Sequence, residues 1–473
     1  MEDNKNNRGR TFFKNFGIYS VGVLGTRIIT FLMVPLYTYF LDDTSDYGYY
    51  DLCLQLCMLL LPISTLQLRD GAFRFLVDNV DEEHRKKVVT FVCKAISRNI
   101  AIILIAGLLL TIFGHIEYAH YTVALLIAMT LHEVFGQITR GLRRNDIYVK
   151  CNLINALLIG LLSVLLVAIF KMGIEGIFLA NIISRVVTVS IMLFQQKIFQ
   201  KYFFFNLDVR TIRKEIFKYA LPLIPTSLCW LFTTMSDRFF ISYFVSMEAN
   251  GIYAVTIRFT MILQTLTLIF YQTWQETAIS QYRKPDRDNF FSKVFNYYMF
   301  ALVTLLILYS YLLKVNYFWL VAPNYRNGVT YVYILGIITI MMNTSSTFFE
   351  LGYQCGKDTK RAVPALFLSA LLNVILNFLI TSHYGVNGVI FCSFVTYLFL
   401  CVYRFIDTKR FFKIHIQKNT MALCMIVILG YYLFELNLGV VVDMISMTIL
   451  LVLVGVLMPN EVKNMVLSKV KSI

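Results

Sequence analysis

Long apolar segments recur along almost the whole chain, and this pattern limits the possible folds more than any other feature. A helix needs about 20 apolar residues to cross a bilayer, and this criterion predicts about fourteen spans. Backbone groups cannot remain unpaired in lipid, so these segments are predicted to be helices. The predicted spans are residues 12–40, 49–68, 99–114, 119–138, 148–170, 176–196, 219–245, 252–273, 292–313, 329–352, 363–382, 388–405, 420–436 and 438–458.

Composition places the whole chain, and not one anchor segment, in the membrane. Charged residues make up 15% of the 473 residues, whereas a soluble domain carries about 25%. The fold class is therefore predicted to be an all-α polytopic membrane protein. The N-terminal apolar run resembles a signal peptide, but its length, Arg27 and the absence of a small-residue cleavage site favour a first helix that is retained.

Basic residues predict which connections lie in the cytoplasm, because cytoplasmic loops are rich in Lys and Arg. If both termini are cytoplasmic, 36 of the 43 basic residues lie at or beyond the inner ends of the spans. The outer side receives only Lys171, Lys314 and Arg326. The net charge of +15 thus follows membrane sidedness, and nucleic-acid binding, which needs basic residues on one face, is not expected.

Short glycine-containing turns recur in two halves of the chain. GIEG at Gly173–Gly176 is matched by GVNG at Gly385–Gly388, and DYGYY around Gly48 is matched by ANGIY around Gly251. Matches at corresponding places in two six-helix units are typical of a duplicated transporter bundle with its binding site between the halves. The predicted domains are a six-helix lobe at 1–196, a basic cytoplasmic linker at 197–218, a second six-helix lobe at 219–405, and two extra helices with a cytoplasmic tail at 406–473.

Four arginines lie within predicted spans and away from their inner ends: Arg27, Arg185, Arg238 and Arg258. An arginine near the bilayer centre costs roughly 2.5–3.5 kcal/mol, so such residues usually face water or a partner. Arg238 and Arg258 could instead extend to the outer headgroups, and Asp237 could pair with one of them. Polar residues repeat at helical spacing beside these arginines, which favours the wall of an aqueous path over polar helix packing. The two longest stripes are Asn181, Arg185 and Thr188, and Arg258, Thr265, Gln272 and Glu276.

The sign of the embedded charge favours an anionic cargo. Asp237 and Glu133 are the main embedded carboxylates, so arginines are in excess, and the arginine fork binds phosphate oxygens well. The two carboxylates could couple transport to ions, or Glu133 could pair with Arg140 or Arg143. No P-loop, GxSxG or HExxH motif and no His/Cys cluster occurs. No ATPase module, catalytic residues, metal site or cofactor is therefore expected.

The segment FFKNFGIYSVGVLGTRIITFLMVPLYTYFLDDTSDYGYYDL (Phe12–Leu52) resembles the first helix pair of polysaccharide-biosynthesis flippases. These proteins form the Wzx-type branch of the multidrug/oligosaccharidyl-lipid/polysaccharide exporter superfamily. GIEG and GVNG resemble the paired outer turns of that superfamily, and APNYRNGVTYVYILG (Ala322–Gly336) resembles the stretch that leads into its tenth helix.

The resemblance implies two lobes that form a V around a central cavity, in a bacterial plasma (inner) membrane. It also implies a cargo of undecaprenyl-pyrophosphate-linked oligosaccharide, moved from the inner to the outer leaflet for O-antigen, capsule or exopolysaccharide assembly. A polysaccharide polymerase, a chain-length regulator and membrane lipids are the partners that it suggests. Cavity cations of the family are thought to engage the pyrophosphate, a role expected here for the four embedded arginines.

Two alternatives share part of this pattern. A drug/cation antiporter of the same superfamily would have the same fold, although the excess of embedded arginines argues against an organic cation as cargo. A membrane glycosyltransferase, polymerase or ligase would generally need a sizeable loop outside the membrane. The predicted outer connections are short, and the longest spans Lys314–Gly328, so an enzyme is not expected.

Overall fold

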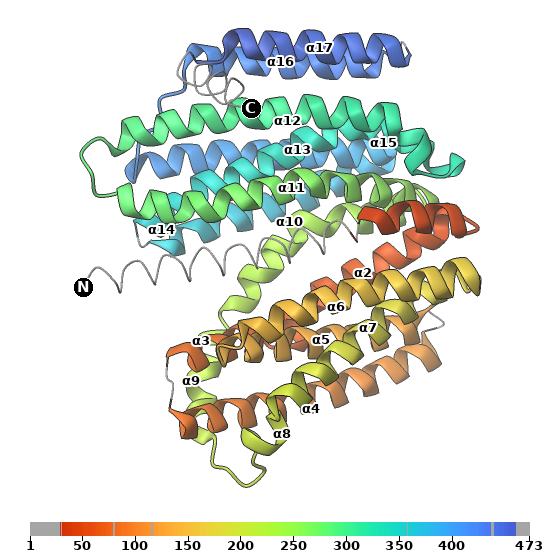
Figure 1. The fold of residues 1–473 in the computed structure, drawn as a ribbon, viewed down its shortest axis with the longest axis vertical. Coiled ribbons are helices and arrows are strands. Elements are labelled where there is room, and N and C mark those ends of the chain that lie inside the picture. Colours follow the sequence, from red (N-terminus) through yellow and green to blue (C-terminus); the bar gives the residue numbers. More distant parts are fainter. Residues whose placement is uncertain are drawn as a thin grey trace. The chain divides into compact units, whose positions relative to one another are not determined.

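The computed structural model is helical throughout the residues that it describes, which are 29, 31–78, 81–114, 117–356, 358–436 and 439–459. No strand occurs in these ranges. The chain forms two compact units, of which the first comprises residues 1–242 and 246–251 and the second residues 243–245 and 252–473. Figure 1 shows both units as stacks of long helices.

The helices of the first unit follow the predicted order. They are Phe31–Phe40, α2 (Thr44–Ser64), α3 (Leu68–Asp78), α4 (Glu82–Phe113), α5 (Ala119–Gly141), α6 (Asn145–Ser163) with the π-helical turn η1 (Val164–Ile169), α7 (Gly173–Gln196), α8 (Ile198–Lys201), α9 (Arg210–Ala220) and α10 (Leu223–Phe244).

The second unit contains the remaining helices, except that residues 247–251 at the start of α11 belong to the first unit. They are α11 (Met247–Gln281), α12 (Arg287–Leu320), η2 (Pro323–Tyr331), α13 (Val332–Asn343), the π-helical turn η3 (Thr344–Phe349), α14 (Glu350–Cys355), η4 (Thr359–Arg361), α15 (Ala362–Asp407), η5 (Thr408–Arg410), α16 (Lys418–Glu435) and α17 (Val440–Leu457).

The described helices agree with the prediction of about fourteen spans. Ten helical segments are long and apolar enough to cross a membrane, and the pair α2–α3, bent by 52°, makes an eleventh. Helix α15 breaks at Gly385, where φ is 57° and ψ is −138°, and therefore holds two predicted spans. The 18-residue helix α16 and the short apolar helix Phe31–Phe40 account for the other two. The predicted all-α polytopic fold is confirmed.

The paired glycine turns have the same local backbone geometry. Gly173 and Gly385, the first residues of GIEG and GVNG, have φ values of 55° and 57°, which a residue with a side chain rarely adopts. Three residues later, Gly176 and Gly388 each face the helix that precedes the turn, where a Cβ atom would lie 3.2 Å from the backbone of Leu166 or Ile380. The second sequence repeat thus reproduces the turn of the first.

The other glycine pair forms a close helix crossing within the first unit. A Cβ atom at Gly48 of α2 would overlap the carbonyl oxygen of Met247, and one at Gly251 would overlap the carbonyl oxygen of Thr44. The two contacts are reciprocal, as in a two-fold symmetric interface. The Asn250 side chain also donates to the carbonyl oxygen of Gly48 at 2.9 Å. The two repeats therefore meet through equivalent residues at this crossing.

Most of the predicted linker is built into the first unit. Helix α9 is amphipathic and buries Ile212, Ile216 and Ala220 against a core to which α3, α4 and α5 contribute. Gly71 of α3 allows a close approach, since a Cβ atom there would lie 2.8 Å from Ile216 Cγ2. The predicted domain boundaries at residues 196, 218 and 405 remain a prediction. The division into two compact units does not test where each sequence repeat begins or ends.

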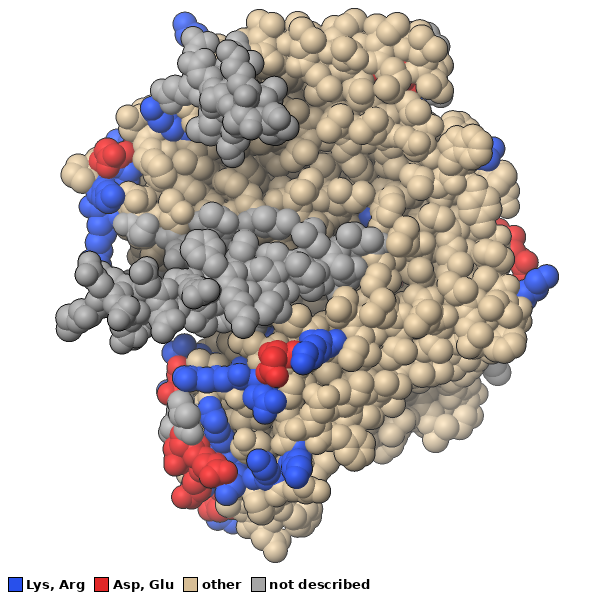
Figure 2. All heavy atoms as spheres, viewed as in Figure 1, with Lys and Arg blue, Asp and Glu red and all other residues tan. Residues whose placement is uncertain are grey.

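Exposed apolar side chains cover the middle of α4. Ile102, Ile105 and Leu108 have 57%, 63% and 61% of their surface exposed, an arrangement that suits lipid and not water. In Figure 2, the charged side chains of the first unit gather at the end where α3, α4 and α9 meet, and the surface along the helices carries few charges. Both features fit helices that cross a bilayer.

A buried ion pair fastens the last helices to the second unit. Lys314 Nζ of α12 lies 3.0 Å from Asp443 Oδ1 of α17 and donates to the carbonyl oxygen of Phe434 in α16. The prediction that Lys314 begins an outer connection is therefore wrong, because α12 continues to Leu320. The buried partner Asp443 removes the need for the ammonium group to reach water.

We expect Gly251→Ala to lower the melting temperature of the purified protein in detergent. The added methyl group would overlap the carbonyl oxygen of Thr44, and overpacking of this kind costs about 1–3 kcal/mol. Gly455→Ala on α17 is the matched control, since no described atom lies within 4 Å of the position that its Cβ atom would take. Equal melting temperatures for both variants would contradict the close crossing.

Candidate functional site

The structure brings part of the predicted site together within the first unit. Arg185 lies on α7, Glu133 on α5, and Asp237 and Arg238 on α10. Arg258 lies on α11 in the part assigned to the second unit. Arg27 lies outside the described residues. The first unit therefore holds most of the predicted site residues.

Arg185 is held by neutral groups of its own helix. Its Nη1 donates to both the carbonyl oxygen and the side-chain Oδ1 of Asn181, each at 2.8 Å. Thr188 donates to the carbonyl oxygens of Ser184 and Arg185, so the predicted polar stripe on α7 exists. Among the described residues, no carboxylate lies within 4.0 Å of the Arg185 guanidinium. In this part of the chain the charge thus has orienting partners but no ion-pair partner.

Side chains from neighbouring helices surround Arg185 at longer range. Tyr50 and Cys57 of α2 and Glu133 of α5 lie in its neighbourhood, and so does His132 of α5. Tyr37 contributes from the helix before α2; its hydroxyl is 2.7 Å from Ser163 Oγ. Helices α2, α5 and α7 therefore converge on one cation.

Arg238 has a carboxylate partner that was not predicted. Its Nε lies 3.5 Å from Asp51 Oδ2, and the side chains are only 8% and 1% exposed. Gln55 Nε2 donates to the other oxygen of Asp51 at 3.3 Å. The spacing of Asp51 and Gln55, four residues apart in an apolar run, is the sequence signal that could have indicated a polar face on α2.

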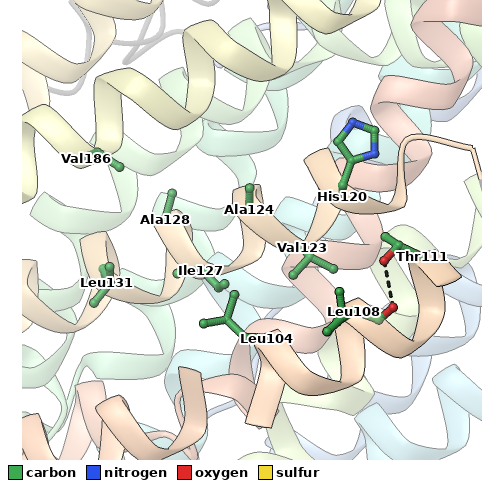
Figure 3. A pocket seen from close by; sticks show the side chains of 11 residues that line it. Leu104, Leu108, Thr111, His120, Val123, Ala124, Ile127, Ala128, Leu131 and Val186 are labelled. Atoms are coloured by element: carbon green, nitrogen blue, oxygen red, sulfur yellow. Dashed lines mark hydrogen bonds between the residues drawn. The ribbon is translucent and has the colours of Figure 1, made fainter. Parts of the chain in front are cut away.

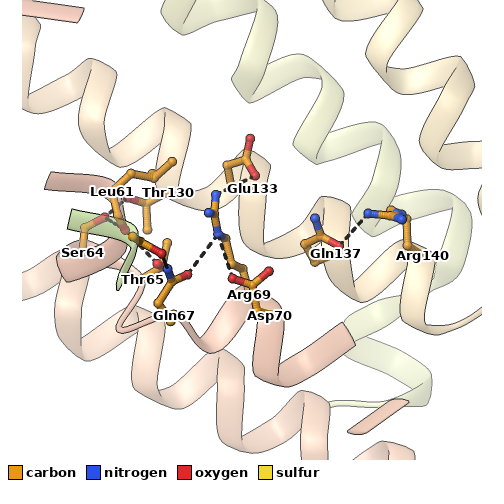
Figure 4. Close-up of polar contacts among 11 residues, drawn as sticks. Leu61, Ser64, Thr65, Gln67, Arg69, Asp70, Thr130, Glu133, Gln137 and Arg140 are labelled. Carbon is orange, nitrogen blue, oxygen red and sulfur yellow. Dashed lines mark hydrogen bonds and ion pairs between the residues drawn. The ribbon is translucent and has the colours of Figure 1, made fainter. Parts of the chain in front are cut away.

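Glu133 pairs with Arg69, not with Arg140 or Arg143. Figure 4 shows Arg69 of α3 extending toward Glu133 of α5, and Arg69 Nη1 lies 3.2 Å from Glu133 Oε2. Arg140 instead donates to Gln137 Oε1 at 3.1 Å and lies over the rings of Phe73 and Tyr148. The role of Arg69 is not apparent from the sequence, because it follows directly after a predicted span, where a basic residue is expected to be solvated.

The second unit contains a different set of polar groups. Arg258 is partly buried, and Thr265, seven residues later, donates to the carbonyl oxygen of Met261 in its own helix. The side chains of Gln272 and Glu276, the other members of that predicted stripe, are outside the described set. The unit also buries Arg404 completely; its Nη1 donates to Glu350 Oε2 at 2.9 Å and to the carbonyl oxygen of Ser345 at 3.1 Å.

An apolar pocket of about 380 Å³ lies between α4 and α5, with Val186 of α7 at one side (Figure 3). Among the described residues that line it, only Thr111 and His120 have polar side chains. The Thr111 hydroxyl already donates to the carbonyl oxygen of Leu108 at 2.9 Å. The lining includes none of the predicted site residues that the structure describes, and its apolar walls could not compensate the charge of an anion.

Among the described polar groups of the first unit, positive charge is in excess at Arg185. Arg238 and Arg69 are neutralised by Asp51 and Glu133, whereas the described hydrogen-bond partners of Arg185 are neutral. A partly buried guanidinium of this kind can donate charge-assisted, bidentate hydrogen bonds to an anionic ligand. The arrangement suits binding and release of an anion.

We expect Asp51→Asn to destabilise the protein strongly. Removing one partner from a buried ion pair leaves an uncompensated charge and costs about 3–5 kcal/mol, so the melting temperature should fall. The combined change Asp51→Leu with Arg238→Met should recover much of the loss. Asp146→Asn, which breaks the exposed pair with Arg144, should have little effect; a similar effect of both single changes would refute the buried pair.

Comparisons with known proteins place this chain in a family. The sequence profile described as "Polysaccharide biosynthesis protein" matches residues 12–274. No curated protein matches.

Solved structures resemble the fold at low sequence identity. The lipid II flippase MurJ in an inward closed conformation has a TM-score of 0.71 and 14% identity, covering 92% of this chain and 97% of that one. An inward-facing multidrug resistance transporter of the MATE family, within the MOP superfamily, has a TM-score of 0.64 and 14% identity, covering 81% of this chain and 95% of that one. The fold is thus shared with a flippase and a transporter. Because the family profile covers more than half of the sequence, this chain belongs to the polysaccharide biosynthesis protein family.

Proposed function

We propose that this protein is a flippase for undecaprenyl-pyrophosphate-linked oligosaccharide in a bacterial plasma membrane. It would move the lipid-linked unit from the inner to the outer leaflet, for assembly of a surface polysaccharide such as O-antigen, capsule or exopolysaccharide. Membership of the polysaccharide biosynthesis family and the fold shared with a lipid II flippase support this proposal. A polysaccharide polymerase and a chain-length regulator are the proposed protein partners.

The observation that carries the proposal is the charge of Arg185. A guanidinium at membrane depth normally faces a carboxylate or water, yet Arg185 is oriented by the carbonyl and amide oxygens of Asn181. These neutral acceptors fix the side chain and leave its charge for a ligand. A diphosphate carries negative charge and several acceptor oxygens, which match the donors of arginine. Arg27, Arg238 and Arg258 are proposed to contact the same cargo.

Transport would proceed by alternating access. The charged headgroup enters on the cytoplasmic side while the polyprenyl tail remains in lipid, where its apolar surface is stable. A conformational change then exposes the headgroup on the opposite side. Asp237 and Glu133 are the proposed groups for ion coupling or charge compensation during this change.

A drug or cation antiporter is the second candidate, because a MATE transporter shares the fold. The embedded charge distinguishes the two, since an organic cation would be repelled by Arg185. A polysaccharide polymerase is the less favoured alternative. Movement of a cationic dye by the protein in vesicles, with no response to lipid-linked sugar, would establish the antiporter.

We expect Arg185→Ala to slow transbilayer movement of a fluorescent undecaprenyl-pyrophosphate-linked oligosaccharide in proteoliposomes. Loss of a charge-assisted hydrogen bond costs about 1.5–3 kcal/mol, or roughly 10- to 100-fold in rate. Arg185→Lys keeps the charge and should retain part of the rate. Arg98→Ala changes an exposed arginine of the same unit and should transport normally. Unchanged transport by Arg185→Ala would remove the main support for the proposal.

Both termini are proposed to lie in the cytoplasm, and labelling of single cysteines tests this orientation. In a cysteine-free variant, we expect Asn327→Cys in η2 to react with a membrane-impermeant maleimide added to intact spheroplasts. Lys284→Cys, in the connection between α11 and α12, should react only after the membrane is opened. Both positions are exposed, so accessibility of the side chain is matched. The reverse pattern would place both termini outside the cytoplasm.

A further inference from the structure

A charged cluster lies in the first unit where α2 ends and α3 begins (Figure 4). Arg69 is its centre: Nη1 faces Glu133 of α5 at 3.2 Å, and Nε faces Gln67 Oε1 at 3.3 Å and Asp70 Oδ2 at 3.5 Å. The side chains of Arg69 and Glu133 are 24% and 39% exposed. The pair is therefore open to exchange with a ligand, in contrast to the buried pair of Arg238 and Asp51.

The backbone at this break orients Arg69. Leu66 and Gln67 have φ values of 48° and 51°, a conformation that costs non-glycine residues about 1–3 kcal/mol and occurs preferentially at functional sites. The Gln67 amide donates to Ser227 Oγ on α10 and its oxygen accepts from Arg69. A neutral amide thus orients the guanidinium, and this support does not depend on the Glu133 carboxylate.

Glu133 has a second cation in its neighbourhood besides Arg69. It contacts Arg69 on α3 directly and interacts at longer range with Arg185 on α7. The two side chains form no ion pair among the described contacts, but Glu133 is near enough to act on the charge of that guanidinium. Glu133 thus acts on two guanidinium groups, of which Arg69 also has Asp70 beside its Nε. A diphosphate, with a negative charge on each phosphate, could take the place of Glu133 at both groups.

We propose that Glu133 is a resident counter-ion that the diphosphate of the cargo displaces, and that Arg69 is consequently a second cargo-binding residue. This inference rests on the flippase function proposed above. On displacement, Arg69 keeps its contact with Gln67 and exchanges a carboxylate oxygen for a phosphate oxygen. Glu133 returns when the cargo leaves, so Arg69 does not remain uncompensated in the empty protein. The competition keeps binding weak enough for release.

The proposal predicts that removing a charge strengthens binding, which a purely structural ion pair would not do. We expect Glu133→Gln, in nanodiscs, to bind undecaprenyl pyrophosphate about two- to tenfold more tightly than the unaltered protein, because a partly exposed pair holds its partners only weakly. Arg69→Ala should bind at least about tenfold more weakly. In the Arg69→Ala background, Glu133→Gln should no longer tighten binding, because the competition is gone.

Matched controls isolate the effect. Asp78→Asn removes an exposed carboxylate that pairs with Arg74 on the same helix as Arg69. This variant should bind undecaprenyl pyrophosphate with the affinity of the unaltered protein. Undecaprenol, which lacks phosphate, should bind equally to all variants. Thermal unfolding verifies that each variant is folded, and Glu133→Ala provides a second charge-removing variant with the same expected tightening if Glu133→Gln is unstable.

The outcomes separate the two proposals. Equal or weaker binding of undecaprenyl pyrophosphate by both Glu133 variants, while the unaltered protein prefers it to undecaprenol, would overturn the counter-ion role and leave the flippase function standing. If the unaltered protein does not distinguish undecaprenyl pyrophosphate from undecaprenol, the flippase function fails, and the counter-ion role fails with it. Tightening that persists in the Arg69→Ala background would assign the competition to Arg185 alone and overturn the role of Arg69.

Discussion

Compensation of positive charge inside an apolar helix bundle is the constraint on which the polar architecture depends. The charges of Lys314, Arg404 and Arg185 are compensated in two different ways. Lys314 and Arg404 have carboxylate partners on other helices and are almost or completely buried. Arg185 has neutral acceptors and, among the described residues, no carboxylate in contact. Because an unpaired buried charge is costly, the first arrangement serves assembly, and the second is suited to a ligand.

The same distinction separates a buried ion pair of the second unit from a partly exposed one of the first. In the second unit, the pair of Lys314 and Asp443 fastens α17 to α12, and the accompanying contact with Phe434 includes α16. In the first unit, Glu133 is partly exposed, contacts Arg69 and has Arg185 in its neighbourhood. A partly exposed pair is weakly held, and weak internal contacts are the ones that a cargo can replace.

Positive φ values and close backbone contacts explain why glycine is required at corresponding places in the two predicted repeats. Gly173 and Gly385 adopt nearly the same positive φ, although the turns differ in their central residues. Gly48 and Gly251 occupy equivalent positions and meet each other through the backbones of α2 and α11. A substitution at either member of this second pair affects the same crossing. Arg185 has no charged counterpart in the other half, because the position 212 residues later is Tyr397.

The sequence by itself determined the fold class, the approximate number of helices and the positions of their turns. These depend on local properties, namely the length of apolar runs and the conformational freedom of glycine, and are therefore readable along the chain. It also indicated that Arg185 lies at membrane depth. Only the tertiary structure decided which charges meet. Asp51 pairs with Arg238, and Asp443 with Lys314, between helices that are far apart in the chain. Helical periodicity assigns a residue to a face of its own helix, whereas the partner on that face is set by helix packing, which no local pattern encodes.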